Sequence, residues 1–169
     1  MGIIGRPGPP REVVAALGLE QGEHVIGWAQ AADGSDVAAT DRALRSVGPL
    51  GALRLDWHQI ATATWREGVL RVVEGRAEPG RRPPMHTWLL ERPGLLPDAV
   101  RDRVTASIVV NQHVRLVGRS GVRILGRRAP GTDELVWTLR FDPDLDPADP
   151  QLRALADAEL ADLRQQLGA

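Results

Sequence analysis

Hydrophobic and polar residues alternate along most of the chain between residues 23 and 141. Leu53, Leu55 and Trp57 alternate with charged residues, and residues 135–141 read Leu-Val-Trp-Thr-Leu-Arg-Phe. A period of two places one set of side chains on a buried face of a strand and the other set on an exposed face. The alternation therefore predicts a body of mostly antiparallel strands.

Turn residues divide this body into candidate strands. Asp33-Gly34 is a strong hairpin signal, and Glu67-Gly68 and Ser120-Gly121 separate later apolar runs. The predicted strand segments are residues 25–31, 37–47, 53–65, 69–74, 85–91, 114–118, 122–127 and 135–141.

Three segments have helical rather than alternating patterns. Residues 9–18 begin with prolines and end at a glycine, and residues 97–110 place Val100, Val104 and Ile108 on one face. The β-branched end of that second segment, residues 108–110, fits a strand as well as a helix. Residues 149–168 form an amphipathic helix in which Asp149 is the N-cap and leucines make the apolar stripe.

The predicted fold is mainly β, of the α+β kind. We expect a partly closed antiparallel barrel or two packed sheets, with one inserted helix and a C-terminal amphipathic helix. The 169 residues carry no internal repeat and no shift in composition that would mark a linker, so the sequence predicts one domain over residues 1–169.

Composition limits the chemistry. The chain has no cysteine, which excludes thiol catalysis, thiolate zinc sites and disulfides. Its longest uncharged stretch, residues 104–114, is about half of the ~20 residues that a membrane-spanning helix needs, and the first ten residues lack the apolar core of a signal peptide. We expect a cytoplasmic protein without a transmembrane segment.

The charge is small overall but unevenly distributed. The formal net charge is −1, yet residues 66–140 contain 14 arginines and 8 acids, whereas residues 141–169 contain 2 arginines and 7 acids. One interpretation is that the acidic tail packs beside the basic middle and neutralises it.

No catalytic, cofactor or metal site is predicted. The four histidines, His24, His58, His86 and His113, have no ligand partner at helical spacing. Ser120 lacks the surroundings of a nucleophile elbow, and the aspartates from Asp142 onward depart from a calcium loop, because Pro147 and Arg153 replace its glycine and glutamate. The sequence therefore favours a protein that is not an enzyme.

Arginines gather on one face of two predicted strands. If residues 119–121 form a three-residue hairpin loop, Val114 and Leu116 share a face with Val122 and Ile124. A two-residue loop would split each apolar set between both faces, so the pattern favours the longer loop. The opposite face then carries three arginines, and the outer face of the next strand adds a fourth. These candidate binding residues are Arg115, Arg123, Arg127 and Arg140.

Four stretches of the chain carry a resemblance to a known family: GEHVIGWAQAADGSDVAATDRALR, LRLDWHQIATATW, DRVTASIVV and ELVWTLRFDPDLDPADP. They resemble a group of uncharacterised actinobacterial proteins with a pleckstrin-homology-like, GRAM-like domain, over about residues 10–168. The resemblance implies a strand meander closed by the C-terminal helix. Phosphoinositide-binding members hold the head group with basic residues at the first strand-to-strand turn. Here that turn, residues 31–36, contains Asp33 and Asp36 and no arginine, so the lipid site is not carried over.

The sequence thus predicts an interaction module that binds a protein or an acidic peptide through its arginine-rich face. One alternative is an anionic-lipid or nucleic-acid binder that uses the same face. Nucleic acid is disfavoured, because Trp137 and Phe141 belong to the apolar face and cannot stack on bases. Another alternative is a small-ligand binder with a pocket between sheet and helix, lined by His58 or His86. A solvated sheet face, or a docking surface for the acidic tail, would explain the arginines without a ligand.

Overall fold

The computed structural model describes residues 8–75, 82–129 and 133–168. The chain divides into two compact units, residues 1–105 (unit 1) and residues 106–169 (unit 2). The fold is mainly β, as predicted, with three antiparallel sheets and three α-helices in the described part of the chain. Over these described residues the sheets do not form a closed barrel.

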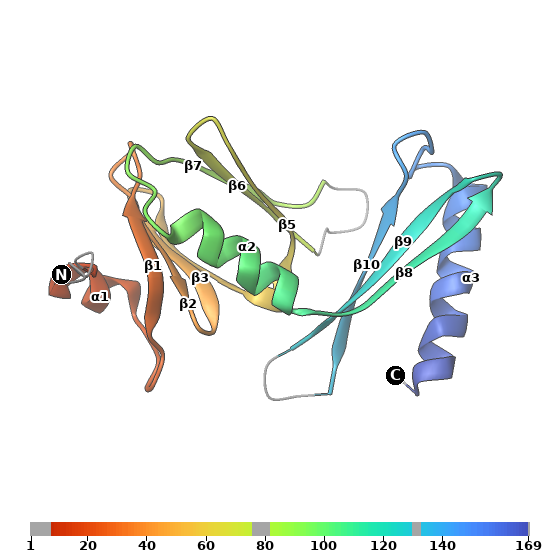
Figure 1. Cartoon of the computed structure of the whole chain (residues 1–169), viewed down its shortest axis with the longest axis horizontal. Coiled ribbons are helices and arrows are strands. Elements are labelled where there is room, and N and C mark those ends of the chain that lie inside the picture. Colours follow the sequence, from red (N-terminus) through yellow and green to blue (C-terminus); the bar gives the residue numbers. More distant parts are fainter. Residues whose placement is uncertain (1–7, 76–81, 130–132, 169) are drawn as a thin grey trace, which may run out of the picture. The chain divides into compact units, whose positions relative to one another are not determined.

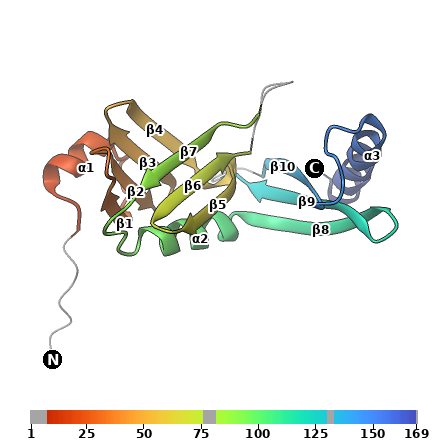
Figure 2. The same cartoon turned by 90° about the horizontal axis from the view of Figure 1, so that it is seen from above.

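Unit 1 contains two meanders of consecutive strands (Figures 1 and 2). The four-stranded sheet has the order β1-β2-β3-β4 and the three-stranded sheet the order β5-β6-β7. Their bounds are β1 Val25–Gln30, β2 Asp36–Thr40, β3 Ala43–Gly48, β4 Gly51–Asp56, β5 Ile60–Arg66, β6 Val69–Glu74 and β7 Met85–Leu89. Helix α1 (Arg11–Leu17) precedes them and helix α2 (Leu96–Ala106) follows them.

Both sheets and α2 contribute to one hydrophobic cluster. It includes Leu44 and Leu55 from the first sheet, Leu70 and Trp88 from the second, and Val100 from α2. The two sheets of unit 1 therefore pack around a shared core that α2 closes, in agreement with the expectation of two packed sheets. Helix α1 lies on the other face of the four-stranded sheet, where Val13 and Leu17 contact Ala38.

Two segments predicted as single strands are each broken in the structure. Residues 37–47 form β2 and β3, because the Thr40 hydroxyl accepts hydrogen bonds from the backbone N–H groups of Arg42 and Ala43 and turns the chain there. Residues 53–65 are interrupted by a short 3-10 helix, Trp57–Gln59, and the strands on its two sides belong to different sheets. Neither break contains a glycine or proline, so the turn signals used to divide the strands did not mark them.

A buried ion pair ties α1 to the first sheet. The Arg45 guanidinium on β3 donates to both carboxylate oxygens of Glu23, at 2.8 and 2.7 Å, and also to the carbonyl of Leu17 at the end of α1, at 3.3 Å. Thr40 donates to the same carboxylate at 2.6 Å, and the backbone N–H of Glu20 donates at 2.9 Å. Burial raises the pKa of Glu23, but these hydrogen bonds, the one from Arg45 foremost, lower it to about 2.

Unit 2 is a three-stranded antiparallel sheet with one helix. The strand order is β10-β9-β8, with bounds β8 Ile108–Val117, β9 Ser120–Arg128 and β10 Leu135–Phe141. Helix α3 (Pro150–Leu167) has Asp149 as its N-cap, whose carboxylate accepts from the backbone N–H groups of Gln151 and Leu152. Both the C-terminal amphipathic helix and the strand at residues 135–141 are confirmed. Helix α2 ends at Ala106 and Ile108 begins a strand, so the strand alternative for residues 108–110 is correct.

Candidate functional site

The strand register of unit 2 places the candidate arginines on one face of the sheet. Arg140 lies opposite Arg123, and Arg123 lies opposite His113 on β8. Residues directly opposite each other in an antiparallel ladder point to the same face, as do residues two apart along a strand. Arg115 and Arg127 therefore share this face. We call it the arginine face, defined by Asn111, His113, Arg115, Arg123, Leu125, Arg127, Val136, Thr138 and Arg140.

The β8–β9 hairpin reaches this arrangement by a different route from the one predicted. The loop contains two residues, Gly118 and Arg119, and Gly118 has the positive φ (+57°) that such a turn requires. Strand β8 also contains a β-bulge between Arg115 and Val117, in which Leu116 is the extra residue. The three-residue loop is therefore wrong. The faces are nonetheless as expected, because a bulge and a longer loop both place Val114 on the same face as Val122.

Close backbone packing at this bulge requires glycine at position 121. A Cβ atom on Gly121 would lie 1.8 Å from the carbonyl oxygen of Val114. The hairpin carrying Arg115 and Arg123 is therefore fixed by a contact that no side chain larger than hydrogen allows.

Helix α3 packs on the opposite, apolar face of the sheet. Ala156 and Leu163 of α3 contact a cluster with Val122 and Ile124, which Trp137, Leu139 and Phe141 extend. The aromatic side chains of β10 lie on this face, as the sequence analysis expected. Because α3 occupies the apolar face, its own carboxylates do not cover the arginine face.

The four candidate arginines differ in exposure. Arg115, Arg123 and Arg140 are exposed, whereas Arg127 is only 2% exposed and lies 3.4 Å from the Ser107 hydroxyl. Burial lowers the pKa of Arg127. Arg127 therefore shares the face by register but does not offer its guanidinium to a partner in solution.

One carboxylate stands at the edge of the arginine face. Asp142 accepts a hydrogen bond from the backbone N–H of Gly121 at 2.8 Å, and its Oδ2 lies 2.9 Å from Nε2 of His113. The hydrogen bond with His113, and then that from Gly121, lower the pKa of Asp142, and the charge of Arg123 contributes as well. Asp142 thus offsets part of the positive charge without an ion pair to an arginine.

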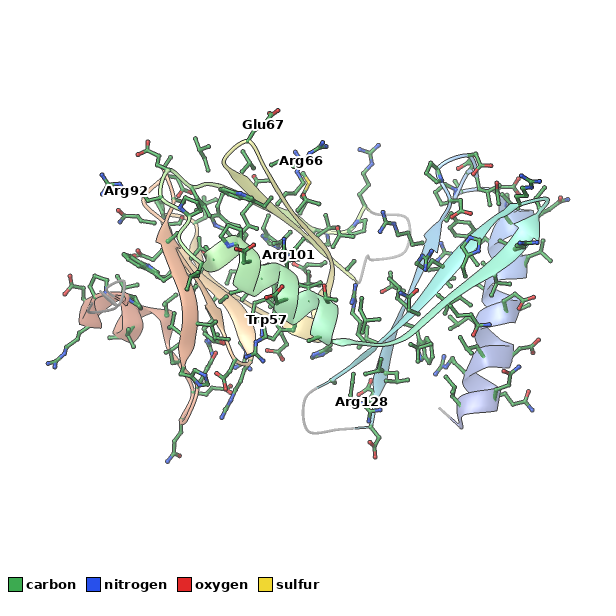
Figure 3. The ribbon with its side chains drawn as sticks, in the orientation of Figure 1. Trp57, Arg66, Glu67, Arg92, Arg101 and Arg128 are labelled. Atoms are coloured by element: carbon green, nitrogen blue, oxygen red, sulfur yellow. The ribbon has the colours of Figure 1, made fainter. Side chains whose placement is uncertain are left out.

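The exposed guanidiniums have few partners of their own. Arg123 donates to the side-chain oxygen of Asn111 at 2.8 Å. Within residues 8–75, 82–129 and 133–168, no carboxylate forms an ion pair with Arg115, Arg123 or Arg140. By contrast, Arg128 at the end of β9, labelled in Figure 3, pairs with Asp133 at 3.0 Å. The arginine face therefore presents three cations to solvent against one partly engaged carboxylate.

Sequence reasoning missed Asn111 and His113 as members of this face, and Asp142 at its edge. Asn111 and His113 precede Arg115 at intervals of two, which is the strand signal. They were overlooked because the strand was expected to begin only at Val114, whereas β8 begins at Ile108.

The histidines are dispersed in the structure. Nε2 of His86 lies 2.8 Å from Oε1 of Glu74, and its ring stacks on Trp88 at a centroid distance of 6.0 Å. His58 lies in the 3-10 helix, and His24 is near Asp41. The part of the chain that the structure describes contains no cluster of three metal-ligating side chains.

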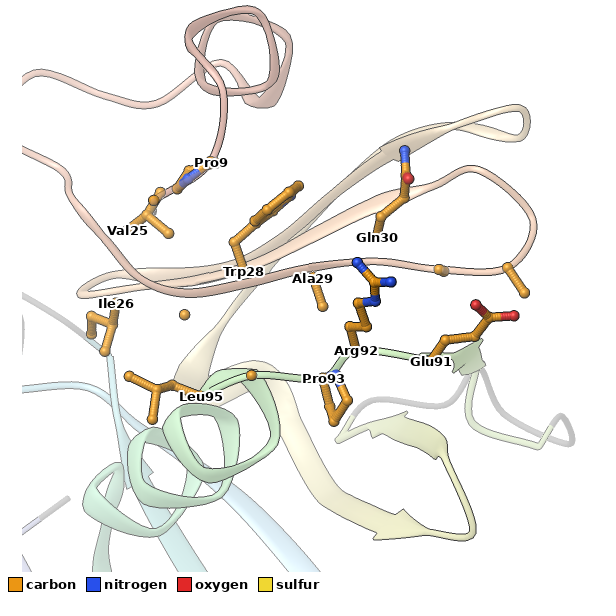
Figure 4. Close-up of a pocket in the computed structure, with 15 residues that line it drawn as sticks. Pro9, Val25, Ile26, Trp28, Ala29, Gln30, Glu91, Arg92, Pro93 and Leu95 are labelled. Carbon is orange, nitrogen blue, oxygen red and sulfur yellow. The ribbon is translucent and has the colours of Figure 1, made fainter. Parts of the chain in front are cut away.

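An open groove of about 1040 Å³ lies in unit 1, along β1 (Figure 4). Its walls are β1 and residues 91–95, with Pro9 at one end, and neither His58 nor His86 lines it. Backbone of residues 95 and 96 approaches within 3.1 Å of the position that a Cβ on Gly27 would take. The backbone of residues 95 and 96 therefore lies close against β1 where α2 begins, and Gln30, Glu91 and Arg92 are polar side chains of the lining.

No family model, no curated protein and no solved structure matches this chain. No helix in the described residues is both long enough and apolar enough to cross a membrane.

Proposed function

We propose that this protein is a non-enzymatic interaction module whose arginine face binds an acidic segment of a partner protein. The observation that carries the proposal is the exposure of Arg115, Arg123 and Arg140 on one sheet face without ion-pair partners in the described chain. Guanidinium groups bind carboxylates in a two-pronged geometry, which suits recognition of aspartate and glutamate side chains.

A short peptide fits the surroundings of this face better than an extended polyanion does. Four carboxylates follow β10 within eight residues, at Asp142, Asp144, Asp146 and Asp149. They would repel an anionic membrane or a nucleic acid that extended beyond the arginines. The aromatic side chains that would stack on bases lie on the α3 side of the sheet.

We further propose that unit 1 is the pleckstrin-homology-like part of the chain. The proposal is supported by a four-stranded and a three-stranded antiparallel sheet that share a core with α2. In this arrangement α2 takes the closing position that the sequence analysis gave to the C-terminal helix. The first strand-to-strand turn, with Asp33 and Asp36, offers no cation for a lipid head group.

Charge reversal tests the proposed function. The variant R115E/R123E/R140E is compared with R11E/R66E/R71E, which makes the same change in net charge at exposed arginines of unit 1 (Arg66 is labelled in Figure 3). Exposed pairs contribute up to about 1 kcal/mol each, so three are worth about 2 kcal/mol together. We expect the first variant to bind a fluorescein-labelled polyglutamate peptide at least about 30-fold more weakly than wild type.

The measurement is fluorescence anisotropy, with circular dichroism to show that each variant is folded. Equal loss in the two variants would mean that net charge, rather than the face, controls binding. Wild-type affinity in R115E/R123E/R140E would refute the site. Tighter binding to phosphatidylserine vesicles or to a single-stranded DNA oligonucleotide than to polyglutamate would assign the face to another polyanion.

A further inference from the structure

Two arginines of the arginine face stand directly side by side. Arg140 and Arg123 are cross-strand partners, and the row continues to His113 on β8. Directly opposite side chains have Cβ atoms about 5 Å apart, and like charges in such pairs destabilise a sheet. Arg115 belongs to a neighbouring row, opposite Gly121. The exposed arginines of the arginine face therefore form one close pair, Arg123 and Arg140, and one separate cation, Arg115.

We propose that the Arg123–Arg140 pair binds the phosphate of a phosphorylated serine or threonine within an acidic peptide. This inference rests on the proposed function and names the group that the close pair recognises. A single carboxylate carries one negative charge and would leave one of the two guanidiniums uncompensated. A phosphate ester carries up to two charges and three acceptor oxygens, so it can accept from both arginines at once.

The surroundings of the pair support this assignment. Arg123 is oriented by its hydrogen bond to Asn111, 2.8 Å long. The nearby carboxylate of Asp142 is engaged by Gly121 and His113, not by either guanidinium. Both arginines are exposed, and neither forms an ion pair within the described residues. A phosphate group on a flexible peptide can reach the pair without displacing an internal partner.

The phosphate is assigned to a peptide rather than to a lipid because of the acidic segment that follows β10. Asp142 and Asp144 contact the β8–β9 hairpin, where Asp142 accepts from Gly121 and Asp144 accepts from the Ser120 hydroxyl, so their charges would oppose docking of an anionic membrane surface on the pair. A peptide can present its phosphate while its ends lead away from these carboxylates.

The experiment compares two fluorescein-labelled peptides of one sequence, with several glutamates around a central serine that is either phosphorylated or not. We expect phosphorylation to lower the Kd of the full-length protein about tenfold, because one to three charge-assisted hydrogen bonds are added. In R123Q/R140Q the two peptides should bind equally. In R115Q both should bind more weakly, while the ratio between them is preserved.

The outcomes separate this inference from the proposed function. Equal binding of both peptides to wild type would refute the phosphate site but leave the acidic-peptide function intact. A preserved ratio in R123Q/R140Q would refute the assignment to this pair. If neither peptide binds, both proposals fail. Tighter binding of phosphoinositide-containing vesicles than of the phosphopeptide would assign the phosphate to a lipid and refute the peptide source.

Discussion

Replacing Glu23 with glutamine tests how much the buried ion pair of unit 1 contributes to stability. The Glu23 carboxylate is fully buried and accepts four hydrogen bonds, two from Arg45, one from Thr40 and one from the backbone of Glu20. Glutamine keeps the size of the side chain but removes its charge. Arg45 would remain buried without a counterion, and such a broken pair typically costs 3–5 kcal/mol.

The pKa of Glu23 gives an independent magnitude. Its fall from an ordinary 4.5 to about 2 corresponds to ~3 kcal/mol of stabilisation at neutral pH. Because the pKa of the folded state is the lower one, this stabilisation is fully present above pH 4.5. It is lost as the pH falls from about 4.5 toward 2, where the carboxylate becomes protonated in the folded protein too.

Urea unfolding of wild type and E23Q at several pH values measures both quantities. Four of the five tryptophans, Trp28, Trp57, Trp65 and Trp88, lie in unit 1, so tryptophan fluorescence reports mainly on this unit. We expect a difference of about 3–5 kcal/mol in unfolding free energy at pH 7 that shrinks steadily below pH 4.5. A difference under about 1 kcal/mol, or one that does not change with pH, would refute the reasoning.

Three further predictions concern unit 2. D142N should tighten binding of the polyglutamate peptide by about two- to fivefold, because it removes the carboxylate at the edge of the arginine face; unchanged anisotropy titrations would contradict this. D149A should lower the unfolding free energy of unit 2 by about 1 kcal/mol through loss of the α3 N-cap, as followed by circular dichroism, with D162A at an exposed position of α3 as the control. G121A should destabilise the β8–β9 hairpin by about 1–3 kcal/mol or more through the clash with Val114, and a melting temperature equal to that of wild type would show that the contact can relax.

Much of the fold follows from patterns in the sequence. Where the structure differs from the predicted elements, the cause is a specific contact. The period of two at residues 135–141 and the cap at Asp149 identify β10 and α3 with their faces. The turn after Thr40 was missed, because it depends on hydrogen bonds that a threonine hydroxyl accepts from the backbone rather than on glycine or proline. The division into two units follows from which apolar faces pack together, and no linker composition marks it.

The arginine face was predicted only in part, because the sequence pattern indicates which residues share a face but not which of them are exposed. Alternation fixes which residues share a face, so Arg115, Arg123, Arg127 and Arg140 were grouped correctly on register. Exposure is a tertiary property, and nothing in the alternation distinguishes buried Arg127 from the others. The pairing of Asp142 with His113 joins positions 29 residues apart and depends on the hairpin bulge, which the sequence does not specify.

The contrast between the two hydrophobic cores has a consequence for regulation by ligands. Among the described residues, the main cluster of unit 1 contains sixteen buried side chains and that of unit 2 contains four. A unit with few buried contacts opens at a lower free-energy cost, so its folded population responds more to mass action. A partner present at a hundred times its Kd would add about 2.7 kcal/mol to unit 2, a large share of what so small a core supplies. If the arginine face binds the proposed partner, its occupancy would raise the resistance of this half of the chain to proteolysis.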